Sequence, residues 1–478
     1  MTKKLKIHFV GIKGVGQTAL AIIAKEAGFE VTGSDIEEEF ITSECLKKAG
    51  IEPINKFSAE NIKDQDLVIT TGAHGGFDNL EVQEAKKKGI KVITKGEAVG
   101  LFMDGSFFGN KFEGISVAGS HGKTTVTAIV ATILSQNSLD PSYVIGTGII
   151  PSLGLPGHFG RGKFFVAEAD EYATEPKYDR TAQFLWQHPK ICIFTNIELD
   201  HPDIYENVEQ VRGVFLKFAK NLPQDGVLVA NGDDEEVVKL LKDYSGRVVT
   251  YGFSPDNDFS LARVRVSESQ TFFWVNSHGV SLGEFTINVP GEHNALNALS
   301  AIIAASESGV SLEGIKKGLS QFKGTKRRFE FVGKMPNGAL VFDDYAHHPT
   351  EIKQTLKTFR QSFPKSNIVC IFQPHTYSRT KELFEQFSRS FTDANTVILV
   401  NIFPSLREEK DESVSSEKLA QNVANFNRKV TFLPSFSDVV EYIDQSGFDQ
   451  KTVIITMGAG DVYKIGQELI SKAFNLRL

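Results

Sequence analysis

Short apolar runs alternate with helical patterns along the first hundred residues. The runs of strand length lie at 7–11, 31–35, 67–71 and 92–94. Stretches between them, such as 17–27, show the apolar spacing of helices. Buried strands of a parallel sheet are apolar on both faces, and a helix usually connects one such strand to the next. This part of the chain therefore predicts a doubly wound α/β domain.

The same alternation begins again twice. A patch rich in glycine, aspartate and asparagine at 104–114 predicts a linker. The strands expected after it lie at 115–118, 163–168, 191–196 and 227–230, followed by a β-rich stretch at 248–290 and helices at 293–308 and 312–321. A basic segment at 323–328 predicts a hinge, and the last strands are expected at 340–343, 368–372, 397–400 and 453–457. We predict the α/β fold class, with three consecutive α/β domains at 1–110, 111–325 and 326–478.

Composition agrees with a chain of several globular domains. Its 478 residues are too many for one compact core. The net charge of −7 argues against a general nucleic-acid or anionic-membrane binder, since such proteins need a surplus of basic residues. Three widely spaced cysteines and the absence of a long apolar run predict a reducing compartment and no membrane segment. We therefore expect a cytoplasmic protein.

A glycine loop follows the first predicted strand and opens a helix. In such a loop, glycines let the backbone approach a phosphate at the helix N-terminus. Here the glycines are Gly11, Gly14 and Gly16, and Lys13 occupies the middle glycine position of GxGxxG. Asp35 ends the next strand, where a carboxylate could meet a ribose. The loop is compatible with a hydride-transfer enzyme, and also with a tight turn that holds no ligand.

A second glycine loop, at 118–125, is more specific. Its sequence is Ala-Gly-Ser-His-Gly-Lys-Thr-Thr, between a predicted strand and a predicted helix. Backbone N–H groups of such a loop surround phosphate, the lysine offsets its charge, and the hydroxyl reaches magnesium. Only two residues separate Gly119 from Gly122, which is shorter than the usual Walker spacing and fits a generic P-loop kinase less well.

Carboxylates and a histidine follow two further strands. Glu168 closes one strand, and Asn196 and His201 follow another. Since the carboxyl ends of parallel strands meet at one edge of a sheet, these groups could converge on one magnesium ion beside the phosphate loop. Histidine is an unusual ligand for a hard cation, so His201 taken alone is interpreted as a surface residue.

Together these motifs resemble the Mur ligases, the ATP-dependent enzymes that build the peptidoglycan stem peptide. The loop at 119–125, Glu168, Asn196 and His201 match the central ATPase domain of that family in order and spacing. The motifs that match the adenine-contacting segment and the C-terminal domain lie at 291–298, 326–329, 343–350, 373–380 and 457–461. The last two are similar to the branch that adds L-alanine to UDP-N-acetylmuramate.

The resemblance implies a Rossmann-like N-terminal domain, a P-loop ATPase-like central domain and a Rossmann-like C-terminal domain that binds the amino acid. It implies the cofactors ATP and Mg²⁺. The residues implied for the UDP-sugar are Gly11, Gly14, Val15, Gly16, Ser34, Asp35, Thr71 and Gly72. Those implied for ATP are Gly119, Ser120, His121, Gly122, Lys123, Thr124, Thr125, His293, Asn294, Asn297 and Arg327. The implied metal ligands are Thr124, Glu168 and His201, and the implied catalytic residues are Lys123, Asn196, His201, Arg327, His347 and Arg379.

The activity implied is ATP-dependent ligation of L-alanine to UDP-N-acetylmuramate through an acyl phosphate, giving ADP and phosphate, in peptidoglycan precursor synthesis. The partners would be these small molecules, with no nucleic acid and no membrane, and the protein would be a monomer or a homodimer. Some positions depart from the alanine-adding branch. Tyr172 stands where that branch usually has serine, residues 173–179 look closer to the ligase that recycles the murein tripeptide, and Ala346 replaces a usual glycine.

Three alternatives therefore stay open. The chain could attach L-alanyl-γ-D-glutamyl-meso-diaminopimelate to the same nucleotide sugar. It could be a nicotinamide-dependent dehydrogenase, a hypothesis that leaves the loop at 119–125 unexplained. It could also be a non-catalytic nucleotide-binding homologue, against which the presence of Lys123, Glu168 and His201 argues. Some Mur ligases carry a modified lysine after the histidine motif, and the matching position here is predicted to be Phe215.

Overall fold

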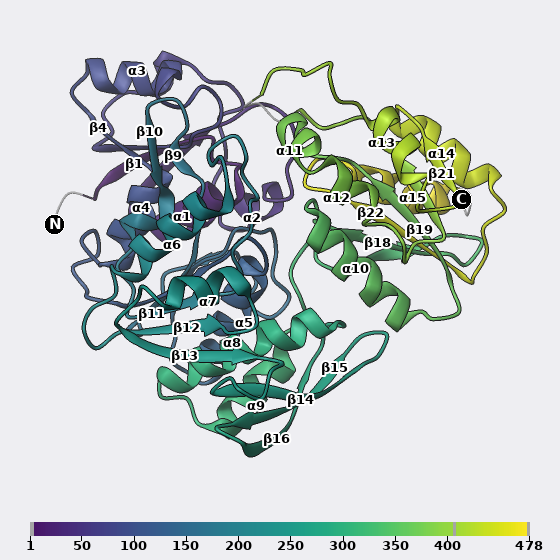
Figure 1. The fold of residues 1–478 in the computed structure, drawn as a ribbon. Coiled ribbons are helices and arrows are strands. Elements are labelled where there is room, and N and C mark those ends of the chain that lie inside the picture. Colours follow the sequence, from purple (N-terminus) through teal and green to yellow (C-terminus); the bar gives the residue numbers. More distant parts are fainter. Residues whose placement is uncertain (1–3, 405–407, 476–478) are drawn as a thin grey trace.

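The computed structural model describes residues 4–404 and 408–475 and contains three large β-sheets that follow one another along the chain (Figure 1). The N-terminal sheet is parallel, with the strand order β2-β1-β3-β4. Its strands are β1 Lys6–Val10, β2 Glu30–Ser34, β3 Leu67–Thr70 and β4 Lys91–Thr94. Its helices are α1 Val15–Glu26, α2 Ser43–Lys48, α3 Leu80–Lys87 and α4 Lys95–Met103, with the short turns η1 Ala59–Asn61 and η2 Gly76–Asp78.

The central sheet has ten strands in the order β16-β15-β14-β13-β12-β11-β5-β8-β6-β7. They are β5 Glu113–Ala118, β6 Ser142–Val144, β7 Gly157–His158, β8 Phe164–Ala169, β11 Ile191–Phe194, β12 Val227–Asn231, β13 Arg247–Gly252, β14 Phe259–Val266, β15 Thr271–Ser277 and β16 Val280–Ile287. A separate hairpin joins β9 Ala173–Glu175 to β10 Asp179–Ala182 and leads into η3 Gln183–Trp186. The helices are α5 Lys123–Gln136, α6 Val208–Ala219, α7 Glu235–Leu241, α8 Glu292–Glu307 and α9 Leu312–Gln321.

The C-terminal sheet has six strands in the order β17-β18-β22-β19-β20-β21. They are β17 Glu330–Lys334, β18 Leu340–Asp344, β19 Asn367–Phe372, β20 Thr396–Leu399, β21 Val430–Phe432 and β22 Thr452–Met457. The helices are α10 Pro349–Ser362, α11 Tyr377–Glu382, α12 Phe384–Ser388, α13 Ser416–Val423, α14 Phe436–Gln445 and α15 Tyr463–Asn475. Below, the segments that carry these three sheets are called the N-terminal, central and C-terminal units.

The predicted α/β class is confirmed, and the differences in detail have physical causes. The strand expected at 191–196 ends at Phe194, because Thr195 and Asn196 turn toward the phosphate loop, where each bonds to the main chain of His121. The expected linker at 104–114 carries Phe108 and Phe112, whose rings pack against Phe159. This segment is therefore held by an aromatic cluster. The exact domain limits stay a prediction.

Among the described residues, the buried core of each unit is apolar and forms two separate clusters, and one cluster of the N-terminal unit also includes Val144, Phe165 and Ala167 of the central sheet. Helix α5 has the buried run 125–134 and packs on the central sheet beside helices α8 and α9, which also contact that sheet. Phe215, the position matched to the modified lysine, is fully buried against Phe184 and Phe194. Across the described ranges, no helix is both long enough and apolar enough to span a membrane.

Candidate active site

The second glycine loop connects β5 to α5, where the helix N-terminus faces a cavity. Gly119 and Gly122 have φ angles of +143° and +85°, which glycine adopts without strain. A Cβ at Gly119 would lie 1.9 Å from the Thr195 hydroxyl oxygen, so side chains are also excluded by space. The Asn196 side chain accepts from the His121 N–H at 2.8 Å and donates to the His121 carbonyl at 3.2 Å. The loop is thus fixed before any ligand binds.

Lys123 is the buried cation of this loop. Its ammonium donates to the Gly119 carbonyl at 2.6 Å and to the Glu171 carboxylate at 3.0 Å. Burial alone would lower the pKa of Lys123, but the charges of Glu171, Asp170 and Asp200 outweigh that effect and raise it. The lysine is therefore charged at neutral pH, as neutralisation of phosphate requires.

The predicted metal ligands line one cavity of about 250 Å³. The Thr124 hydroxyl donates to Glu168 at 3.1 Å, and burial raises the pKa of that carboxyl. His201 faces the same cavity, and its Nε2 lies 3.6 Å from the Asp200 carboxylate. A hydroxyl, a carboxylate and an imidazole beside a phosphate loop fit a magnesium ion that also contacts phosphate oxygens. The residues present therefore fit the cofactor.

Residues from all three units line the 250 Å³ cavity. The N-terminal unit contributes Val15, Gly16 and Lys95, and the C-terminal unit contributes Arg327 and His347. The first glycine loop therefore opens onto the same space as the phosphate loop.

A second cavity, of about 220 Å³, lies on the other side of the phosphate loop. Its lining includes His121, Gly122, Thr125, Asn196, His293, Asn294, Asn297 and Arg328. Burial and the nearby charge of Arg328 lower the pKa of His293 to about 4, so this ring is neutral. The Asn294 amide donates to the Pro290 carbonyl at 2.7 Å and supports the start of α8. The predicted ATP-binding residues of α8 are thus gathered beside the loop.

Hydrogen bonds to neighbouring segments fix the first half of the first glycine loop, while Val15 and Gly16 line the 250 Å³ cavity. Asp35 accepts from the backbone N–H of Lys13 at 2.7 Å, and the Lys13 ammonium donates to the carbonyls of Ile36 and Glu38. Gly11 has a φ of +74° and packs on Thr71. The Ser34 side chain is fully buried and donates to Glu81, so the structure does not bring it to the cavity.

Arg327 is held by the C-terminal unit. Its guanidinium donates to Asp343 at 2.8 Å and to the carbonyls of Gly458 and Gly460 at 2.6 and 2.9 Å. These bonds use most of its donors, which limits its capacity to bind a phosphate. The neighbouring Arg328 lines the cavities of 220 and 250 Å³ and pairs with Glu351 at 3.3 Å. The sequence motif predicted Arg327 as a phosphate-binding residue. In the structure, Arg328 has more free donors and lines the cavities on which the phosphate loop opens.

Arg379 connects the C-terminal unit to the central unit. It pairs with the Asp200 carboxylate at 3.0 Å and donates to the Asp200 carbonyl at 3.0 Å. Both residues line a small cavity of about 40 Å³ together with Tyr172, His201, Asp203 and His375. The Tyr172 hydroxyl donates to Asp203 at 2.8 Å and its ring contacts His201 edge-on. Positive and negative groups thus lie side by side next to the 250 Å³ cavity.

Three family models match the chain in order. The "Mur ligase family, catalytic domain" model matches residues 6–107, the "Mur ligase middle domain" model residues 117–305, and the "Mur ligase, glutamate ligase domain" model residues 327–460. The chain belongs to the Mur ligase family. Two relatives named UDP-N-acetylmuramate–L-alanine ligase are similar over nearly their whole length. The one from Desulfitobacterium hafniense (strain Y51) is 38% identical over 98% of this chain and 99% of its own length. The one from Geobacter sp. (strain M21) is 40% identical over 97% of each.

A solved structure supports the same family assignment. The crystal structure of UDP-N-acetylmuramate-alanine ligase from Thermotoga maritima matches this Mur ligase with a TM-score of 0.81 and 30% identity, covering 98% of this chain and 99% of that one. The similarity covers all three units.

The sequence did not identify four acidic residues of the site as functional candidates: Glu171, Glu198, Asp200 and Glu351. Each is at least partly buried against a predicted site residue. Each also lies within or next to one of the motifs recognised in the sequence, and that proximity could have identified it as a candidate. What the sequence lacked was the pairing across units, of Asp200 with Arg379 and of Glu351 with His121. Within the C-terminal unit, Glu351 also lies 3.3 Å from the Nδ1 of His347, whose pKa is lowered by burial to about 4.

Proposed function

We propose that this chain is the ligase that joins L-alanine to UDP-N-acetylmuramate at the expense of ATP. The observation that carries the proposal is the 250 Å³ cavity, where the first glycine loop, the phosphate loop and the C-terminal unit meet. A ligase with three substrates needs a common point at which a sugar carboxylate, a phosphate and an amine can react. The two relatives of 38% and 40% identity carry this activity in their names.

Each unit takes one substrate in this proposal. The UDP-sugar is held by residues 1–110, ATP by 111–325, and the amino acid by 326–478 together with the strand ends of the central sheet. Lys123 and the helix N-terminus at Thr124 and Thr125 face the phosphates of ATP. The nucleoside occupies the 220 Å³ cavity, where Asn297 and the neutral His293 offer hydrogen bonds to a base.

Thr124, Glu168 and His201 would hold magnesium, which would supply positive charge beside the carboxylate and the phosphates. A carboxylate oxygen of the sugar attacks the γ-phosphorus, and the bond from that phosphorus to ADP breaks. The amine nitrogen then attacks the acyl carbon, phosphate leaves, and the nitrogen loses a proton to form the amide. Lys123 remains charged throughout and holds the phosphoryl oxygens. Enclosure by the three units excludes water, which would otherwise hydrolyse the acyl phosphate.

The 40 Å³ cavity favours a small zwitterionic amine. Arg379 and Asp200 pair with each other there, and a zwitterion would exchange that contact for two, its carboxylate on Arg379 and its ammonium group on Asp200. A tripeptide is the second candidate, favoured by residues 173–179 of the β9–β10 hairpin, whose sequence looks closer to the ligase that recycles the murein tripeptide. This hairpin contacts the N-terminal unit, where the Tyr178 hydroxyl donates to Asp78 at 2.7 Å.

The test is phosphate release by the purified protein with ATP, Mg²⁺ and UDP-N-acetylmuramate. L-alanine is compared with L-alanyl-γ-D-glutamyl-meso-diaminopimelate as the added amine. Stimulation by L-alanine alone is expected. Stimulation by the tripeptide alone would reassign the amine, and no release with either amine would refute the proposed ligase activity.

A further inference from the structure

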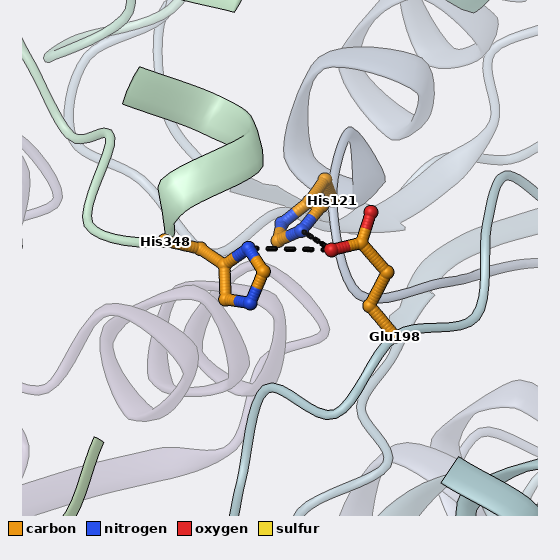
Figure 2. Close-up of side chains that lie close together, drawn as sticks. All are labelled: His121, Glu198 and His348. Carbon is orange, nitrogen blue, oxygen red and sulfur yellow. Dashed lines mark ion pairs between the residues drawn. The ribbon is translucent and has the colours of Figure 1, made fainter. Parts of the chain in front are cut away.

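Four side chains connect the phosphate loop to the C-terminal unit. His121 and Glu198 belong to the central unit, and His348 and Glu351 belong to the start of α10. We call them the interdomain cluster. Figure 2 shows His121 and His348 next to each other, both paired with the same oxygen of the Glu198 carboxylate. The nitrogen–oxygen distances are 3.5 Å from His121 and 3.3 Å from His348.

Glu198 contacts the loop with its main chain and the C-terminal unit with its side chain. Its N–H donates to the Ser120 hydroxyl at 2.8 Å, and that hydroxyl donates back to the Glu198 carbonyl at 3.1 Å. Its carboxylate accepts from the Thr350 hydroxyl at 2.8 Å. One residue thus joins the phosphate loop to the N-terminal end of α10.

His121 lies between carboxylates from the two units. Its Nδ1 is 3.4 Å from Glu351, opposite the Nε2 contact with Glu198, and only 8% of the side chain is exposed. Burial alone would lower the pKa of His121, but the charges of Glu351 and Glu198 raise it to about 10. The ring is therefore a buried cation matched by two anions. Although the cluster has the ligand types of a metal site, its charges are already paired.

The cluster depends on how the two units are placed. The chain passes between them once, through residues 322–329 that follow α9 and precede β17. A rotation there would separate Thr350, His348 and Glu351 from the loop, while Ser120, His121 and Glu198 would stay together.

We propose that Glu198 is a positioning residue through which closure of the C-terminal unit sets the conformation of the phosphate loop. The closed arrangement holds His121 from both sides, so the loop N–H groups keep the geometry that phosphoryl transfer needs. In the open arrangement the His121 side chain loses the Glu351 contact and gains freedom, while Asn196 still holds its main chain. The consequence for turnover rests on the proposed function, whereas closure and nucleotide binding can be measured without it.

The test uses Glu198→Gln, with Lys357→Gln as the matched control. Lys357 pairs with Glu292 at 2.7 Å across the same two units but contacts no residue of the phosphate loop in the described structure. Closure is followed by energy transfer between labels on cysteines introduced at the exposed Val280 and Asn425. The three native cysteines are buried and will react poorly. Binding and closure with a non-hydrolysable ATP analogue and Mg²⁺ are measured first, and turnover second.

We expect Glu198→Gln to reduce the nucleotide-induced closure constant by about fivefold or more, and kcat by about tenfold, with a smaller change in KM for ATP. Lys357→Gln should leave nucleotide-dependent closure close to that of the wild type. If Glu198→Gln closes as readily as the wild type, the inference is wrong. This outcome does not depend on which amine the enzyme uses. If that variant does not fold, Thr350→Val removes the contact from the C-terminal side and decides the question with the same closure assay.

Discussion

At the scale of single residues, Lys123 and Glu171 must be considered together. The ammonium and the carboxylate form a buried ion pair at 3.0 Å, and Glu171 is only 2% exposed. Removing one partner of such a pair leaves an uncompensated buried charge, which costs about 3–5 kcal/mol. A Lys123→Ala variant therefore loses activity for two reasons, the missing phosphate ligand and reduced stability.

The double variant Lys123→Ala/Glu171→Gln separates these two effects. We expect it to regain most of the thermal stability lost by Lys123→Ala, because no unpaired charge remains. We expect kcat to stay at least about 100-fold below the wild type, because the lysine of the phosphate loop no longer offsets the charge of the phosphates. Thermal melting and phosphate release measure the two quantities. Recovery of turnover in the double variant would refute the role given to Lys123.

At the scale of elements, the packing of α9 on α5 depends on a glycine. A Cβ at Gly318 in α9 would lie 2.7 Å from the Ile133 Cα in α5. Gly213 in α6 is also inside a helix, but a Cβ there would meet nothing within 4 Å. The two glycines therefore differ in packing and share the same cost in helix propensity.

Replacing each glycine by alanine should have opposite effects. Gly213→Ala should stabilise the protein by up to about 1 kcal/mol through helix propensity. Gly318→Ala should destabilise it by about 1–3 kcal/mol, because the added methyl forces α9 away from α5. Chemical denaturation of both variants beside the wild type measures the difference. A stabilised Gly318→Ala variant would show that the two helices can separate at little cost.

At the scale of the whole molecule, strands and helices could be predicted from local pattern. Apolar runs such as 67–70 and 453–457 became strands because a buried parallel strand is apolar on both faces. The hairpin β9–β10 was missed, since it lies outside the large sheets and shows no alternation that marks a strand. Its position depends on tertiary contacts, among them Gly72 against Pro176.

The site was predictable as motifs and less so as contacts. Lys123, Thr124, Glu168 and His201 share a cavity, as their positions at strand ends suggest. The pairing of Arg379 with Asp200 and of Thr350 with Glu198 joins residues more than 150 positions apart. A local sequence pattern cannot predict a contact between residues so far apart in the chain. The residue types predicted the chemistry, while the arrangement of units decided which donor meets which acceptor.

That arrangement buries histidines between the central and C-terminal units. His348 is 5% exposed, begins α10 by accepting from the Thr350 N–H, and faces Glu198 at 3.3 Å and the ring of His121 at 4.7 Å between centroids. Burial, together with the charge of His121, lowers its pKa to about 4. An unfolded histidine, with a pKa near 6.5, binds its proton earlier as the pH falls.

The contribution of His348 to stability is therefore complete above about pH 6.5 and is lost as the pH falls toward 4, by up to about 1.4 kcal/mol per pH unit. His348→Asn keeps a good helix cap and removes the titrating ring. Between pH 7.5 and 4.5 the wild type should lose about 2 kcal/mol more unfolding free energy than this variant, measured by chemical denaturation. His278→Asn, at a side chain that is 71% exposed, should follow the wild type. Parallel losses in His348→Asn and wild type would mean that folding leaves the proton affinity of His348 unchanged, and that its burial between the units is not maintained in solution.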